Sequence, residues 1–293
     1  MILEIGSRGK EVKELQEFLK ITADGIFGVG TKAAVQKWQS NNGLTSDGIV
    51  GPKTWDAMGL ATTDASEQVY TTDNGLIIHK HFLPVSEYKQ GPIKPEWAFL
   101  HHTAGWNNPY KTIDNWGRDT RGAIATEFVL GGPSIRGNDD KYDGEMVQAF
   151  PEGNYGWHLG ANGSQKMHIN SVAIEVCNFG YVVNGKAYQG TTVADSQIVE
   201  LSKPFRGHKT WHRYSDAQIE ALHKWILFIA ERDNIDVKAG LPALIKEKGA
   251  EAFEWNADAY YGRVKGLWTH TNTRKDKVDM FPQQELIDML ISL

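Results

Sequence analysis

The sequence has little of what would tie a protein to an oxidising compartment, a membrane or a nucleic acid. Its 293 residues include one cysteine, Cys177, so no internal disulfide can form. No run approaches the roughly 18 to 20 apolar residues of a membrane-spanning helix, and residues 1–30 lack the basic start and apolar stretch of a secretory signal. The formal net charge of −5 gives no cationic field. We therefore expect synthesis in a reducing cytoplasm, no nucleic-acid partner and no membrane insertion.

A short motif occurs twice in the first sixty residues. The run Asp-Gly-Ile-Phe-Gly at 24–28, followed by Thr31, recurs as Asp-Gly-Ile-Val-Gly at 47–51, followed by Thr54. Each Asp-Gly pair is a turn signal, and each threonine is placed as a helix N-cap. Apolar residues three or four apart precede each copy and indicate helices. The pattern predicts a compact unit of three helices.

These residues resemble the peptidoglycan-binding domain 1 family. The matching residues are the two Asp-Gly turns, Gly6-Ser7-Arg8-Gly9, Leu15-Gln16, Leu19, Gln36-Lys37-Trp38-Gln39 and Asn42-Gly43-Leu44. The resemblance implies that residues 1–60 form a small all-α module that binds bacterial peptidoglycan. We expect its apolar residues to form the core, because so small a domain has few others to bury. Residues 61–68 are small and polar, which predicts a linker.

The remaining residues, 69–293, alternate between strand-like and helix-like segments. Short apolar and aromatic runs predict strands at 96–101, 125–130, 145–150 and 171–177. Ser215 and Gln218 form a capping-box pattern before an amphipathic helix, and a last helix follows Pro282. These segments predict an α/β domain with a mixed central β-sheet flanked by helices. Residues 181–212 and 234–262 show no clear period.

Metal-binding residue types occur at a predicted strand end and in a late loop. His101 stands where a buried strand gives way to a turn of small residues, and residues 270–279 contain His270, Asp276 and Asp279. A catalytic zinc ion takes three ligands of the histidine or carboxylate kind and leaves a fourth position for water. Either segment alone is a weak signal, because an isolated histidine is more often structural.

Together, four motifs in order resemble the type 2 N-acetylmuramoyl-L-alanine amidases. They are His101-x-Thr103-Ala104, Trp157-His158-Leu159-Gly160, Ser171-x-x-Ile174-Glu175 and His270 with Lys277-x-Asp279. The resemblance implies the mixed sheet with flanking helices, and a Zn2+ cofactor held by His101, His270 and Asp279. Asp276 is a rival third ligand, because Arg274 and Asp276 repeat the basic-x-acid pattern closer to His270.

The resemblance also implies roles for the residues around the metal. Glu175 matches the catalytic base, and a carboxylate in an apolar strand is costly without a use or a partner; a buried ion pair is the alternative. Some relatives use a tyrosine where Thr126 stands, which leaves the role to Glu175. Lys277 would stabilise the oxyanion, with a solvated surface lysine as the alternative. His158 is predicted to contact substrate.

The implied function is hydrolysis of the amide between the lactyl group of muramic acid and L-alanine in peptidoglycan. A wall-binding module without a secretion signal resembles a phage endolysin that reaches the wall after holin-type release; an effector of a contractile injection system or a bacterial autolysin exported by another route would look the same. We expect a monomer. The rival is a non-catalytic peptidoglycan-recognition or virion structural protein. A cysteine peptidase is disfavoured, because Cys177 lies in a strand with no helix terminus beside it to lower its pKa.

Overall fold

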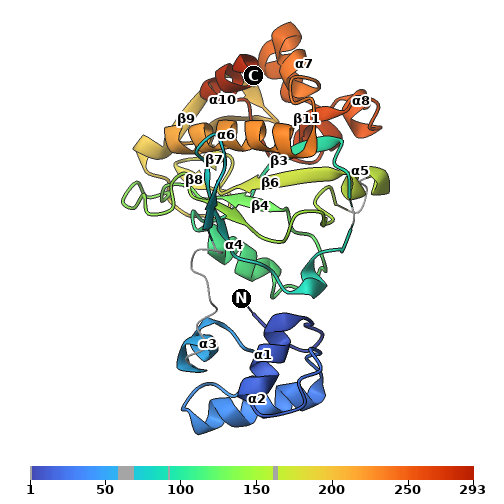
Figure 1. Ribbon diagram of the computed structural model, residues 1–293. Helices are drawn as coiled ribbons and strands as arrows, with labels where there is room; N and C mark the ends of the chain where they lie inside the picture. Colours follow the sequence, from blue (N-terminus) through green and yellow to red (C-terminus); the bar gives the residue numbers. More distant parts are fainter. Residues whose placement is uncertain (1, 59–68, 92, 161–163) are drawn as a thin grey trace.

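The structure of the protein is a computed structural model that describes residues 2–58, 69–91, 93–160 and 164–293 (Figure 1). The linker predicted at 61–68 lies outside the described residues. The described chain forms a small helical unit at the amino-terminal end and a larger α/β unit. Each unit has its own hydrophobic core.

The amino-terminal unit is all-helical, as predicted. Its helices are α1 (Lys10–Phe18), α2 (Val29–Asn41) and α3 (Pro52–Met58). One side chain or more from every helix is buried in a shared core, which consists of Leu3, Val12, Leu15, Phe27, Val35, Val50, Trp55 and Met58. Phe27 and Val50 of the repeated motif therefore serve the core, as the small size of the unit requires, whereas Ile26 is 39% exposed.

The repeated motif is held together by two buried glutamines in equivalent positions. Gln16 Nε2 donates to Asp24 Oδ1 at 2.8 Å and to Thr31 Oγ1 at 3.0 Å, while Gln16 Oε1 accepts the Gly25 N–H at 2.8 Å. Gln39 makes the corresponding hydrogen bonds with Asp47, Thr54 and Gly48. The two copies of the sequence motif are thus two copies of one hydrogen-bonded turn.

The prediction that Thr31 and Thr54 are N-caps is wrong. The N-cap of α2 is Gly28, and Thr31 lies inside the helix; Thr54 likewise lies inside α3. The physical reason is that the side-chain amides of Gln16 and Gln39 are buried, so their N–H groups need hydrogen-bond acceptors within the core. Each threonine hydroxyl supplies one and is therefore turned toward a glutamine.

The larger unit is built on a seven-stranded mixed sheet, as predicted. Its strands, in spatial order, are β1 (Val69–Thr71), β2 (Ile77–Lys80), β5 (Met146–Gln148), β4 (Phe128–Leu130), β6 (Ser171–Val176), β3 (Trp97–His102) and β11 (Gly266–Thr269). Strands β4, β6, β3 and β11 are parallel, and β4 pairs antiparallel with β5. The carboxyl ends of four neighbouring strands therefore meet at one edge of the sheet.

Helices cover the sheet and complete the core. They are α4 (Pro109–Trp116), α5 (Gln165–Ile169), α6 (Asp216–Asp233), α7 (Leu241–Lys248), α8 (Ala257–Tyr260), α9 (His270–Thr273) and α10 (Gln284–Ser292), with 3-10 turns η1 (Val85–Glu87), η2 (Asp195–Gln197) and η3 (Gly249–Phe253). The predicted capping box of Ser215 and Gln218 starts α6. Helix α6 lies over the sheet in Figure 1, and its Trp225 packs edge-on against Phe128 of β4.

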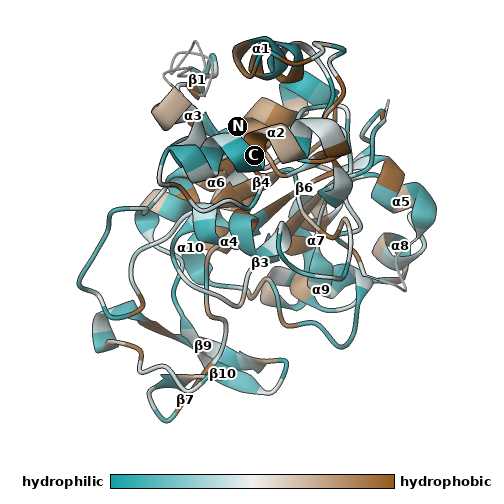
Figure 2. Ribbon diagram, turned by 90° about the horizontal axis from the view of Figure 1, so that it is seen from below, coloured by the Kyte–Doolittle hydropathy of each residue, from teal (hydrophilic) through white to brown (hydrophobic). Residues whose placement is uncertain are grey.

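The segment at 181–212, which shows no sequence period, folds into two hairpins outside the main sheet. The first joins β7 (Val182–Val183) to β8 (Lys186–Ala187), and the second joins β9 (Ile198–Phe205) to β10 (His208–His212). Figure 2 shows β7, β9 and β10 together in a lobe beside the hydrophobic central strands. Strands β7 and β8 have two residues each, too few for a period, and in the eight-residue β9 only Leu201 and Phe205 are buried, so burial does not alternate along it.

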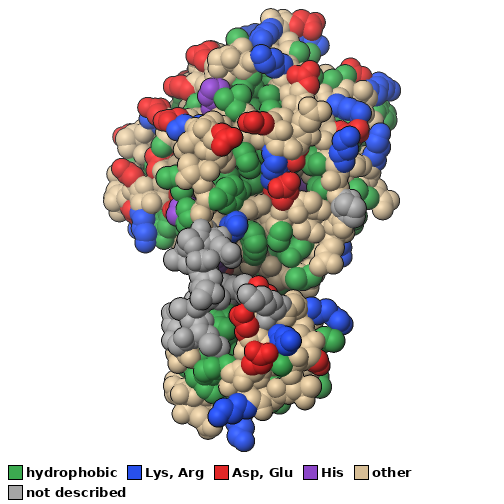
Figure 3. All heavy atoms as spheres, viewed as in Figure 1, with side chains coloured by type: hydrophobic (Ala, Val, Ile, Leu, Met, Phe, Trp, Pro, Cys, Tyr) green, Lys and Arg blue, Asp and Glu red, His purple; other side chains and the backbone are tan. Residues whose placement is uncertain are grey.

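The surface carries charges of both signs. Figure 3 shows lysine and arginine side chains interspersed with aspartate and glutamate on the face in view. Within the described residues, no helix has the length and apolar character needed to cross a bilayer.

Candidate metal centre

The register of three neighbouring parallel strands brings the predicted site residues to one place. In the sheet, His101 of β3 pairs directly with Glu175 of β6. On the other side of β3, Leu100 pairs with Thr269, the last residue of β11, so His270 follows at the level of His101. Paired residues of adjacent strands point to the same face of a sheet. The carboxyl edge of the parallel strands, where ligands commonly bind in α/β folds, therefore carries all three side chains.

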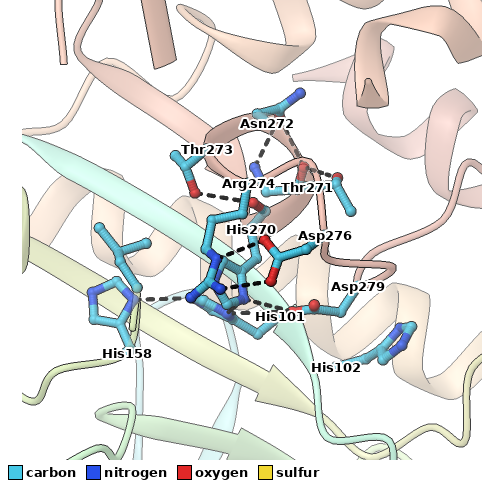
Figure 4. A network of polar contacts seen from close by, with 12 residues as sticks. His101, His102, His158, His270, Thr271, Asn272, Thr273, Arg274, Asp276 and Asp279 are labelled. Carbon is cyan, nitrogen blue, oxygen red and sulfur yellow. Dashed lines mark hydrogen bonds and ion pairs between the residues drawn. The ribbon is translucent and has the colours of Figure 1, made fainter. Parts of the chain in front are cut away.

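Three buried ligand atoms converge at this edge (Figure 4). His101 Nδ1 lies 3.1 Å from His270 Nδ1, and Asp279 Oδ2 lies 3.0 Å from His270 Nδ1 and 3.4 Å from His101 Nδ1. Ligands at the usual zinc distances of about 2.0–2.1 Å in a tetrahedral arrangement stand roughly 3.3 Å apart. The triangle of donor atoms thus has the dimensions of one face of a tetrahedral metal site.

The loop after β11 selects Asp279 rather than Asp276 to approach the histidines. The Thr271 N–H donates to the Asp279 carbonyl oxygen at 3.1 Å, which closes the loop on itself. Asp276 is exposed and accepts two hydrogen bonds from the Arg274 guanidinium, at 2.9 and 2.6 Å. Since Arg274 occupies both oxygens of Asp276, the basic-x-acid pattern nearer His270 forms a local ion pair.

The ionisation states suit metal binding. Burial, reinforced by the charge of His270, lowers the pKa of His101 to about 4, which leaves its imidazole neutral at pH 7. Burial alone would raise the pKa of Asp279, but the charge and hydrogen bonds of His270 and His101 hold that pKa well below its usual value. A neutral imidazole and an ionised carboxylate are the forms in which these side chains bind metals.

Glu175 stands beside this triangle with a free carboxylate oxygen. Its Oε2 atom is buried and has no hydrogen-bond partner among the described residues. Burial, and then the charge of Asp279, raise the pKa of Glu175 well above its usual value, while the charge of Lys277 lowers it. The alternative of a buried ion pair is realised one strand away instead, where Glu127 binds Arg232 at 2.7 Å.

Thr126 takes no part in this group. Its hydroxyl is buried and donates to the Phe128 carbonyl oxygen at 2.8 Å. Lys277 is partly buried, and its positive charge lowers the pKa of Glu175 and the pKa of His101.

His158 lies directly beside His101 (Figure 4). Its side chain is buried, with Nδ1 3.0 Å from His101 Nε2 and Nε2 2.7 Å from Ser171 Oγ. If a metal ion held His101 Nδ1, the proton of His101 would reside on Nε2 and be donated to His158 Nδ1, and His158 Nε2–H would donate to Ser171 Oγ. The predicted substrate contact of His158 stays a prediction.

Ser171 begins the motif Ser171-x-x-Ile174-Glu175, but the motif predicted no role for it. It begins β6, four residues before Glu175, and side chains two and four apart in a strand share a face. This alternation was available in the sequence and would have placed Ser171 on the face of the sheet that carries Glu175. Ser171 is buried, and its hydroxyl oxygen lies 2.7 Å from His158 Nε2.

His102 points away from the triangle, as strand alternation predicts. Its Nδ1 lies 2.9 Å from the hydroxyl of Tyr214, which precedes α6. Two cavities in the described structure also lie elsewhere: one of about 230 Å³ lies between β1 and α6, and one of about 520 Å³ is lined by Arg136, residues 190–192 and Ala194. Neither contains a residue of the triangle.

The α/β fold and the buried His-His-Asp group suit a hydrolase, and comparison with known families supports this class. The family model of N-acetylmuramoyl-L-alanine amidase matches residues 91–249, which is more than half of the chain. A peptidoglycan binding domain model matches residues 8–58. The chain belongs to the N-acetylmuramoyl-L-alanine amidase family, which confirms the resemblance indicated by the motifs. His270 and Asp279 lie beyond the matched residues.

Individual relatives are similar over parts of their length. The zinc D-Ala-D-Ala carboxypeptidase of Streptomyces albus G is 44% identical over 62 residues, which make up 18% of this chain and 24% of that protein. An uncharacterized protein of Kitasatospora aureofaciens is 39% identical over 69 residues, 21% of this chain and 58% of the relative. The chain thus spans less than two thirds of either. The structure of PlyL is 13% identical, with a TM-score of 0.39, and the match covers 69% of this chain and 85% of that one.

The contact between His158 and His101 predicts a measurable effect on metal affinity. His158→Phe keeps the ring volume but removes the acceptor for His101 Nε2–H, and loss of such an outer partner typically costs about 10- to 100-fold in affinity. His158→Asn places an amide oxygen near the position of Nδ1 and should retain most of the affinity. Competition with a chromophoric chelator for Zn2+ measures both. Equal affinity of His158→Phe and wild type would show that His158 does not orient the ligand.

Proposed function

We propose that this protein is a zinc-dependent amidase that hydrolyses the bond between the lactyl carbonyl of N-acetylmuramic acid and L-alanine in bacterial peptidoglycan. The observation that carries the proposal is the convergence of His101, His270 and Asp279 beside Glu175, within a chain of the amidase family. The three converging side chains are the proposed metal ligands, and Glu175 and Lys277 are the proposed catalytic residues.

The donor set fits zinc. Two imidazole nitrogens and one carboxylate oxygen form a common ligand set of catalytic zinc, and this set leaves a fourth position open. Two histidines and one carboxylate also suit non-haem iron, but the neighbouring glutamate and the family membership favour hydrolysis. A zinc ion held there supplies a water of lowered pKa and polarises the scissile carbonyl.

Glu175 is proposed to move the proton. Hydrolysis requires that one proton leave the attacking water and that one arrive at the alanine nitrogen as the C–N bond breaks. Glu175 lies next to His101 in the sheet, and its buried Oε2 is without a partner among the described residues. Burial raises the pKa of Glu175 above that of an ordinary glutamate, which strengthens this carboxylate as a proton acceptor.

Lys277 is proposed to stabilise the negative charge that develops on the former carbonyl oxygen. It stands two residues before Asp279 in the loop that carries the third ligand, and its charge acts on Glu175 and His101. A donor placed at a developing oxyanion typically contributes about 3 kcal/mol to catalysis.

The amino-terminal unit is proposed to hold the enzyme on the polymer. In this division residues 1–60 form the binding module, 61–68 a linker and 69–293 the catalytic domain. A tethered binding module raises the effective concentration of the catalytic domain at its insoluble substrate. We further propose that the protein acts as a monomer and lyses cells in the manner of an endolysin, after holin-type release to the wall.

Purified protein should release new amino termini and free muramic carboxyl groups from bacterial sacculi. A chelator should abolish this release and added Zn2+ should restore it, because the water and the carbonyl lose their activating ion. Amino-terminal labelling with mass spectrometry of the released peptides measures the reaction. Release of reducing sugars instead would indicate a glycosidase, and no release by zinc-loaded protein would favour a non-catalytic wall-recognition protein.

Replacing Glu175 by Gln should lower kcat by about 100- to 10,000-fold, the usual contribution of a general base, while zinc stays bound. Glu127→Gln is the matched control, since Glu127 is also buried but binds Arg232. It should lower the free energy of unfolding and leave kcat within a few-fold of wild type. Zinc content and kcat on a soluble muropeptide are the measurements. Retained activity in Glu175→Gln would move the base to another residue.

Removal of residues 1–68 should separate polymer binding from chemistry. The shortened chain should cleave a soluble muropeptide as fast as the full chain, because the proposed catalytic residues all follow residue 68. On sacculi at limiting enzyme it should be at least tenfold slower, since it loses the gain from tethering. Equal rates on sacculi would contradict a binding role for the module.

A further inference from the structure

The turn of the β9–β10 hairpin carries an unusual residue. Arg206 and Gly207 form its two-residue loop, with φ values of 49° and 81°. Positive φ at both positions is the signature of a type I′ turn, which favours asparagine, aspartate or glycine at the first position. An arginine there adopts a left-handed conformation at a cost. Such a conformation persists only where surrounding contacts hold the residue in place, and here these contacts are made by the side chain.

The Arg206 side chain reaches across to the loop that carries the third metal ligand. Its Nη1 donates to the Lys275 carbonyl oxygen at 2.7 Å and its Nη2 to the Thr271 carbonyl oxygen at 3.1 Å. Its Nε lies 3.1 Å from Glu254 Oε2, and the side chain is only 13% exposed. Thr271 and Lys275 both lie between His270 and Asp279, so one guanidinium spans the loop.

The same hairpin contacts the far end of this loop. Trp211 of β10 stacks on Phe281, with ring centroids 4.5 Å apart and planes at 19°. The other face of Phe281 stacks on Tyr214 at 4.5 Å and 16°. Phe281 stands two residues after Asp279. The hairpin therefore contacts the chain both before and after Lys277 and Asp279.

We propose that Arg206 is a positioning residue for the metal centre, through which the β9–β10 hairpin holds the 270–279 loop in its metal-binding conformation. This inference rests on the proposed function, since it takes Asp279 to be a zinc ligand. A planar guanidinium can bridge two carbonyl oxygens in a fixed geometry, which a lysine ammonium cannot. By fixing Thr271 and Lys275, it reduces the conformational entropy that the loop would lose when Asp279 binds a metal.

The test uses the full chain with Arg206→Asn. Asparagine is favoured at this position of a type I′ turn, so the hairpin is retained while the bridge to Thr271 and Lys275 is lost. We expect the affinity for Zn2+ to fall about 10- to 100-fold, as for other outer partners of metal ligands, and the visible spectrum of the Co2+-substituted protein to change. Arg206→Lys, which keeps the charge but cannot bridge both carbonyls, should fall between Arg206→Asn and wild type.

Lys209→Ala is the matched control, because Lys209 lies on the same hairpin and pairs with Glu200 within it. It should leave both the Zn2+ affinity and the Co2+ spectrum unchanged. Wild-type protein that binds no zinc would overturn the proposed function itself. Wild type that binds zinc, together with an Arg206→Asn variant of equal affinity and an identical Co2+ spectrum, would overturn the positioning role alone. Equal loss in Lys209→Ala would also overturn it, since the effect would then belong to the hairpin as a whole.

Discussion

The hydrogen-bond register between β6, β3 and β11 is the constraint on which the site depends. A shift of one residue between two strands would turn the affected side chains to the opposite face of the sheet. The observed register sets His101 beside Glu175 and places His270 just past the end of the next strand. The buried apolar residues of β3 and β6 fix that register, because both strands are covered on both faces. The geometry of a polar site is thus determined by the packing of a hydrophobic core.

The same burial makes the group of polar side chains costly without a ligand. Two imidazoles and two carboxylates lie together where little water reaches, and His270 Nε2 and Glu175 Oε2 lack partners among the described residues. An uncompensated buried polar group is unfavourable. A cation between the His101, His270 and Asp279 donor atoms would offset the repulsion between Asp279 and Glu175.

Sequence patterns predicted the parts of the fold that depend on local chemistry. The central strands were evident as apolar runs, and the cap of α6 was evident from Ser215 and Gln218. The approach of His101 to His270 came from the family resemblance, since no local pattern connects residues so far apart in the chain. The role of Thr31 depends on a partner in another segment, Gln16, so its local motif suggested the wrong contact. The contact between His158 and His101 also joins separate segments, and no local motif predicts it. The choice of Asp279 over Asp276 required the Arg274 ion pair, which competes for one of two similar carboxylates.

The contacts that hold the amino-terminal unit together join residues close in sequence, whereas those of the triangle join residues far apart. This difference sets the order in which the two can form during synthesis. The glutamines of the amino-terminal unit bind partners no more than 15 residues away, and contacts of short separation form quickly. His101 and His270 are 169 residues apart, and the loop that completes the triangle ends at Asp279. As the ribosome extends the chain, the amino-terminal unit can therefore form early, whereas the His101–His270–Asp279 triangle cannot exist until residue 279 has emerged. A chain that ends before residue 279 would keep the first unit and lack the triangle.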